Sequence, residues 1–222
     1  MARIDTLANF LTDVAAAIKT KTGKTDLITP ANFDTEIASI ESGGSSKFAP
    51  SHIGFYGYNG TDLSDVIATL DTRNMTFMGS MFRECPNIIS LDLSSFDTSN
   101  VTAMNHMFCN SPSLETINVS NFDTSKVTTL HFGFYNLQKI TSLDLSSWYT
   151  PNVTDMGYLF GSCKALRYLD IRNFDFTNVT ITDSMFSGVP TSCEIIVKDD
   201  AAKTWVQNIN RNFTNVKTVA EL

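Results

Sequence analysis

Apolar and polar positions alternate along this chain in a pattern that returns every 26 residues. The stretch LDLSSFDTSNVTAMNHMF, which begins at Leu91, returns as LDLSSWYTPNVTDMGYLF at Leu143, 52 residues later. Similarity at a fixed period of this length is typical of solenoids, in which each repeat packs only on its neighbours. Five copies can be aligned, and they open at Asp65, Leu91, Ile117, Leu143 and Leu169.

The aligned copies share several columns of apolar side chains. The first two columns are Leu91, Ile117, Leu143 and Leu169, then Leu93, Val119, Leu145 and Ile171. An aromatic column follows with Phe96, Phe122, Trp148 and Phe174, and a second one with Phe82, Phe108, Phe134, Phe160 and Phe186. A single copy cannot bury these columns by itself. Stacking the copies would join them into one continuous core, which predicts a solenoid.

Each copy also predicts its own local structure. The alternation in LDL predicts a very short strand, and FDTSN is typical of a turn, because Asp, Ser and Asn bond their own backbone. Met104, Met107 and Phe108 follow at the i, i+3, i+4 spacing of one helical face, with Thr102 at the position of an N-cap. We therefore expect each copy to fold as strand, turn, short helix or helical turn, and loop.

The repeat resembles a known family. LDLSSFDTSNVTAMNHMFCNSPSLETI is similar to the leucine-rich repeats of BspA-like bacterial surface proteins, which are also found in mycoplasma lipoproteins. The resemblance covers roughly residues 65–197 and implies a right-handed solenoid with a parallel sheet along one side. The expected fold class is thus an α+β leucine-rich-repeat solenoid, with five repeats over residues 65–194.

Other segments flank the repeats. Residues 1–45 predict a helical module with a linker, and 46–64 predict a strand that caps the first repeat. Residues 195–222 predict a second cap of strand, helix at about 200–209, and strand near Val216. The first helix carries an apolar face of Leu7, Phe10, Leu11, Val14 and Ile18. Because so small a helical module is rarely stable alone, we expect this face to mediate self-association or docking.

The N-terminal segment has a resemblance of its own. LTDVAAAIKTKTGKTDLITPANFDTEIASI is similar to a short segment of tail and baseplate-associated proteins of phages that infect Gram-positive gut bacteria. It implies a virion or prophage context. By analogy with tail fibres, it also implies assembly as a trimer through residues 1–45.

Composition narrows the possible chemistry. The net charge of −7 argues against nucleic acid and anionic membranes as partners, and no apolar run is long enough to span a bilayer. The segment KTGKT is not a phosphate loop, because Ile18 stands where that motif requires glycine. MARIDTLANF lacks the apolar core of an export signal, so we expect no glycosylation of the Asn-x-Ser/Thr matches that the repeat creates.

Nor do the cysteines and histidines form a site. Cys85 and Cys163 share one repeat position on separate turns, too far apart for a disulfide, so we expect the four cysteines to be buried thiols of a protein made in a reducing cytoplasm. His52, His106 and His131 have no Cys or carboxylate at metal-ligand spacing. We therefore expect no metal, no cofactor and no enzymatic activity.

Two surfaces could bind a ligand. The strands present an outward polar column of Asp92, Asn118, Asp144 and Asp170, next to one of Ser94, Ser120, Ser146 and Arg172. These are either a solvated face or a polar groove for a glycan or a calcium-bridged ligand. A second outward column is Ser80, His106, Phe132, Tyr158 and Ser184, flanked by His131 and Tyr135. Its rings are either covered by loops or other subunits, or stack on the faces of sugars.

These features favour a non-enzymatic adhesion or receptor-binding component of a phage tail or tail-like particle. Its partners would be a bacterial cell-surface glycan or protein and, through residues 1–45, itself or other tail proteins. It would be made in the bacterial cytoplasm and reside in the virion. One alternative is a BspA-like adhesin at the bacterial surface that binds host or neighbour-cell ligands. The other is a purely structural virion decoration protein.

Overall fold

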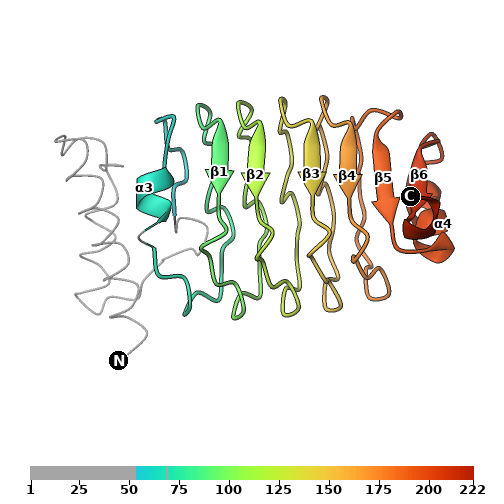
Figure 1. Cartoon of the computed structure of the whole chain (residues 1–222), viewed down its shortest axis with the longest axis horizontal. Coiled ribbons are helices and arrows are strands. Elements are labelled where there is room, and N and C mark those ends of the chain that lie inside the picture. Colours follow the sequence, from blue (N-terminus) through green and yellow to red (C-terminus); the bar gives the residue numbers. More distant parts are fainter. Residues whose placement is uncertain (1–53, 69) are drawn as a thin grey trace.

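The protein folds as a row of coils stacked along one long axis (Figure 1). The computed structural model describes residues 54–68 and 70–222. The predicted helical module of residues 1–45, with its apolar face of Leu7, Phe10, Leu11, Val14 and Ile18, lies outside the described residues and stays a prediction.

The predicted strands form at the start of the second and later copies. They are β1 (Ser90–Asp92), β2 (Thr116–Asn118), β3 (Ser142–Asp144) and β4 (Tyr168–Asp170), and β5 (Glu194–Val197) follows as the predicted first strand of the C-terminal cap. Neighbouring strands are parallel and one period apart, so that Leu91 lies opposite Ile117 and Leu143 opposite Leu169. The sheet divides between β2 and β3 into a two-stranded and a four-stranded part. The parallel solenoid and its 26-residue period are thereby confirmed.

The helical turn predicted in each copy is wrong. In the third copy, Leu130 accepts a hydrogen bond from the amide of Gly133, and Phe132 accepts one from Tyr135, so the chain runs through successive tight turns. Phe132 and Asn136 have φ values of 56° and 61°, in the left-handed region, as the third residue of a type II turn requires. These turns bury side chains at the i, i+3 and i+4 positions, such as Met104, Met107 and Phe108, as a helix would. The repeats thus form a parallel β-solenoid rather than an α+β solenoid.

Alternate amides of these turns hold adjacent coils together. The N–H groups of Phe132 and Phe134 donate to the carbonyl oxygens of Gly157 and Leu159 in the next coil, both at 2.9 Å. A ladder of single bridges runs beside them through Phe77, Ala103, Thr129, Asp155 and Ile181. Thr102, expected to cap a helix, instead donates its hydroxyl to the carbonyl oxygen of Thr76 at 3.0 Å.

The start of the solenoid differs from the sequence-based expectation. A short helix, α3 (Ser64–Ile67), replaces the strand of the first copy. The described part of the predicted capping strand, residues 54–63, contains turns and no strand. Phe55 stacks on Phe82 with ring centroids 5.4 Å apart and so begins the second aromatic column. Phe55 does not fall in the column that the 26-residue period defines, because it precedes Phe82 by 27 residues.

Two stacks of aromatic rings fill the core. In the predicted column Phe82, Phe108, Phe134, Phe160 and Phe186, successive rings stack at 5.2 to 5.8 Å, and all five side chains are buried. Phe213 packs edge-on against Phe186 at 5.4 Å and ends the stack. The four cysteines are free and buried, as predicted.

The C-terminal cap has the predicted order. Helix α4 (Asp200–Ile209) and strand β6 (Val216–Thr218) follow β5, and β6 pairs with β5 in parallel. Asp199 caps α4 by accepting a hydrogen bond from the amide of Ala202 at 3.0 Å. The helix presents Trp205 to the last coil, where the indole stacks on Phe176 at 3.9 Å.

Buried threonines join neighbouring coils, and their loss should be costly. Thr98, which is 1% exposed, donates its hydroxyl to the carbonyl oxygen of Asp123 at 3.0 Å and accepts from the Asp123 amide at 2.7 Å. Thr98→Val leaves both backbone groups without a partner, so we expect the free energy of unfolding in urea to fall by about 1–3 kcal/mol.

The exposed Thr128 gives a matched control. Its hydroxyl likewise bonds a neighbouring coil, at the carbonyl oxygen of Thr102, but water can replace that bond. Thr128→Val should change the free energy of unfolding by no more than about 0.5 kcal/mol. Equal losses in the two variants would contradict a special role for the buried threonines.

Candidate ligand-binding surfaces

The outward aromatic column is a stack of rings in the three central coils. His106 lies on Phe132 with centroids 5.0 Å apart and planes within 16°, and Phe132 lies on Tyr158 at 4.5 Å and 3°. His131 and Tyr135 meet Phe132 edge-on at 4.6 and 4.9 Å. All five side chains are half-buried. We call these five residues the aromatic ladder, and the structure brings all of them together.

The backbone of the stacked rings is strained. His106, Phe132 and Tyr158 have φ values of 59°, 56° and 55°, a region that costs an L-residue roughly 1–2 kcal/mol. The same column holds the small residues Ser80 and Ser184 in the first and fifth copies. Bulky rings at such positions are genuine outliers, and strain of this kind gathers at functional sites. The sequence gives no direct sign of it, because none of these residues is glycine.

Two glycines of the fourth coil make room for the flanking rings. A Cβ atom on Gly157 would lie 2.8 Å from Nδ1 of His131, and one on Gly161 would lie 2.9 Å from Cδ2 of Tyr135. Asp155 fixes this arrangement, since one carboxylate oxygen accepts from both the Gly157 amide and Nδ1 of His131 at 2.9 Å. The rings of His131 and Tyr135 therefore occupy space that these two glycines leave free.

The stacked part of the ladder carries no charge at neutral pH. Burial, together with the nearby charge of Arg83, lowers the pKa of His106 below its ordinary value, so its ring is neutral at pH 7. Phe132 has no ionisable group. The ladder thus offers a rigid, largely apolar strip with hydroxyl groups at two of its rings.

Stacking decides which ring surfaces a ligand can reach. Both faces of Phe132 are covered, by His106 on one side and by Tyr158 on the other. Stacking of sugars on the faces of every ring is therefore not possible. Ring edges remain, together with the outer faces of His106 and Tyr158.

The polar column on the strands mainly serves the fold. One carboxylate oxygen of Asp92 accepts from the amide of Ser94 at 3.1 Å and from the side chain of Asn118 at 2.9 Å. Hydrogen bonds from the side chain and the amide of Ser94 lower the pKa of Asp92 below its ordinary value. Asp144 accepts from the amide of Ser146 at 3.0 Å in the same way. Such contacts account for these residues without a ligand.

Asp170 differs from the rest of this column. Its side chain is 1% exposed and forms an ion pair with Arg172. Burial opposes ionisation of Asp170, but the hydrogen bonds from Arg172 and Tyr168 outweigh it and lower the pKa of the carboxyl. The Arg172 side chain is thereby held against Asp170 by hydrogen bonds from its Nε.

Two further kinds of site were sought over residues 54–68 and 70–222. In this part of the chain, no group of three or more His, Cys, Asp or Glu side chains is placed to hold a metal ion. None of the helices described there is both long and apolar enough to cross a membrane.

A comparison with known protein families identifies the family of the repeats. A family model described as "Mycoplasma protein of unknown function, DUF285" matches residues 55–116 and 110–221, which together span most of the chain. The chain belongs to this DUF285 family. No curated protein and no solved structure matches it. The match agrees with the mycoplasma-type repeat expected from the sequence, and both DUF285 segments lie within the solenoid and its C-terminal cap.

Proposed function

We propose that the protein is a non-enzymatic binding protein that attaches to a ligand on a bacterial cell surface through the aromatic ladder. One observation carries the proposal: bulky rings occupy strained backbone positions in three central coils, where the outer coils have serine. The solenoid does not need these rings, since Ser80 and Ser184 adopt the same backbone conformation. Strain without a structural benefit points to a role in binding.

The geometry favours a protein ligand over a glycan. A rigid strip of closely packed aromatic rings resembles the centre of protein–protein interfaces, where Tyr and other large side chains contribute most of the binding energy. A sugar cannot stack on Phe132, the central ring of the ladder, because both of its faces are covered.

We propose a phage tail or tail-like particle as the setting, with residues 1–45 as the attachment or oligomerisation segment. The resemblance of that segment to tail-associated proteins supports this. A bacterial surface adhesin of the BspA-like kind is the second candidate, and the family match to mycoplasma proteins favours it. Detection of the protein by mass spectrometry in purified particles supports the first setting. Detection in the surface fraction of uninfected cells supports the second.

A cell-binding assay tests the proposed function. Labelled protein is titrated onto a panel of Gram-positive bacteria, and the double variant Phe132→Ser/Tyr158→Ser is compared with the wild type. Serine suits the backbone of this column, so the fold should persist, while binding should weaken at least about tenfold. Tyr149→Ser is the matched control, because Tyr149 is 54% exposed and lies outside the ladder.

The outcomes separate the alternatives. Loss of binding after protease treatment of the cells indicates a protein ligand, and loss after periodate treatment indicates a glycan. Equal binding by the double variant and the wild type would contradict a role for the ladder. A protein that binds no cells yet enters purified particles would be a decoration protein.

A further inference from the structure

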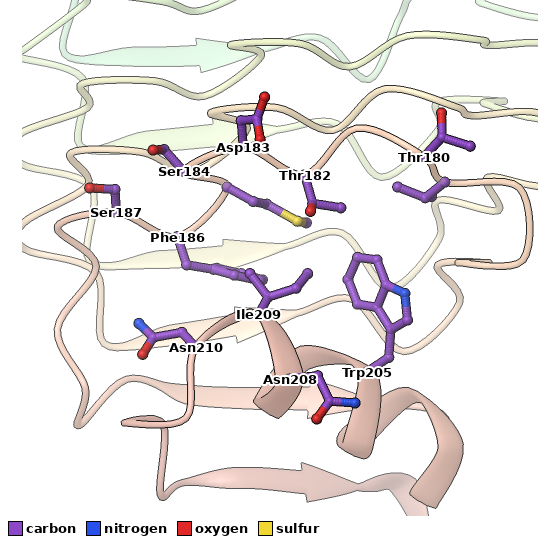
Figure 2. A pocket seen from close by; sticks show the side chains of 12 residues that line it. Thr180, Thr182, Asp183, Ser184, Phe186, Ser187, Trp205, Asn208, Ile209 and Asn210 are labelled. Atoms are coloured by element: carbon purple, nitrogen blue, oxygen red, sulfur yellow. The ribbon is translucent and has the colours of Figure 1, made fainter.

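A groove separates the last coil from helix α4. Its volume is about 600 Å³, within the range of about 300–1,000 Å³ that is usual for small-molecule sites. Figure 2 shows Trp205 and Thr180 at one end of the groove and Ser187 and Asn210 at the other. This groove begins one coil beyond Tyr158, the last ring of the aromatic ladder, but no ladder residue lines it and the proposed function does not use it.

Backbone donors of the last coil face the place where a further coil would lie. In the fourth coil, the amides of Met156, Tyr158 and Phe160 donate to carbonyl oxygens of the fifth. The equivalent amides of the fifth coil belong to Thr182, Ser184 and Phe186, which line the groove. Within the described part of the chain, these three amides have no hydrogen-bond acceptor. They are a row of donors that a ligand could use.

The side chains around these amides are polar and also unpaired. Over the described residues, the side chains of Thr182, Asp183, Ser184, Ser187 and Asn208 make no hydrogen bond or ion pair. Elsewhere in the solenoid, polar side chains such as Thr98 and Asn121 bond a neighbouring coil.

One sequence position at the groove departs from the repeat pattern. Thr182 occupies a column that is apolar in the four preceding copies, Met78, Met104, Leu130 and Met156. A polar residue therefore replaces an apolar one only where the column meets the groove.

The groove combines these groups with apolar surface. Phe186 and Met185 are buried beneath it, and Ile209 and Trp205 are half-buried on the side of α4. Asp183 is the only charged residue among those that line it, which disfavours anions. Apolar C–H faces beside many oxygen atoms that both donate and accept hydrogen bonds are the chemistry of sugars.

We infer that this groove binds a short, uncharged oligosaccharide. The amides of the last coil and the Asn208 side chain donate to sugar oxygens, Asp183 accepts from hydroxyl groups, and Trp205 contacts the apolar face of a ring. An extended peptide fits less well. The donors lie along tight turns with left-handed residues at Ser184 and Gly188, at φ 53° and 81°, which an extended strand cannot follow.

Tryptophan fluorescence gives a direct test on the full-length protein. Trp148 is buried in the core, whereas Trp205 borders the groove, so Trp205 reports on binding. Titration with the trisaccharides of N-acetylglucosamine, glucose and mannose should give a saturable change in emission for at least one of them. The change should be absent in Trp205→Phe, and Asn208→Ala and Asp183→Ala should each weaken binding about tenfold or more.

Matched controls make the result specific. Asn212→Ala removes an exposed amide of the same region that does not line the groove, and it should leave the titration unchanged. Phe132→Ser should leave it unchanged too, which separates this site from the aromatic ladder. The inference is overturned if no trisaccharide changes Trp205 emission at millimolar concentration. Equal binding by Asn208→Ala and Asn212→Ala, or tighter binding of trigalacturonate or tetra-alanine, overturns it as well.

Discussion

Deletion of half a repeat, residues 117–129, is expected to abolish cooperative unfolding, while deletion of a whole repeat, residues 117–142, should leave a shorter folded protein. The whole-repeat deletion joins Thr116 to Leu143, and these residues stand in the same register as Ser142 and Leu143. The half-repeat deletion joins Thr116 to Leu130, which belongs to the turns rather than the strand. At the junction a turn would then lie opposite strand β1, and the aromatic columns on its two sides would be out of register with each other.

Circular dichroism during a thermal melt measures both deletions. The whole-repeat variant should show one sharp transition at a somewhat lower temperature than the wild type, because fewer coils contribute interfaces. The half-repeat variant should show no transition. A sharp melt for the half-repeat deletion would contradict the 26-residue register.

Phe134→Ala is expected to lower the free energy of unfolding by about 3–5 kcal/mol. Phe134 lies in the middle of the buried stack, with Phe108 at 5.2 Å and Phe160 at 5.8 Å. Its side chain is 1% exposed, so its removal leaves a cavity that both neighbouring coils border. Urea unfolding followed by circular dichroism gives the difference from the wild type.

Phe132→Ala is the matched control, since it removes the same side chain two residues away on the outer surface. The loss there should be smaller, because Phe132 is only half-buried and less apolar surface returns to water when its ring is removed. If the two variants lost equal stability, the ladder would be part of the structural core and its role in binding would be in doubt.

Periodicity made the framework of the fold predictable. Columns at a constant spacing predicted the continuous phenylalanine stack and the buried free cysteines, and the resemblance to BspA-like repeats implied the parallel sheet. The helical turn was wrong because successive tight turns and a helix bury the same i, i+3, i+4 positions. Left-handed φ values distinguish the tight turns from a helix. A glycine would have indicated such values in the sequence, but Phe132 and Asn136 stand at these positions.

The candidate site could be predicted in part. The outward column of His106, Phe132 and Tyr158 follows from the period alone, even though the local structure was misassigned. The mutual stacking of the rings depends on the distance between coils and on glycines that make room for their neighbours. The groove beside Trp205 depends on how α4 packs on the last coil, which no periodic pattern encodes.

Radical footprinting of the bound protein tests the central claim most directly. The full-length protein is oxidised by hydroxyl radicals, free and bound to intact bacterial cells, and the modified side chains are located by mass spectrometry. The account predicts that binding protects Phe132, Tyr135 and Tyr158, while the exposed Tyr149 is oxidised equally in both states. Protection of Tyr149, with the ladder oxidised as in the free protein, would contradict it.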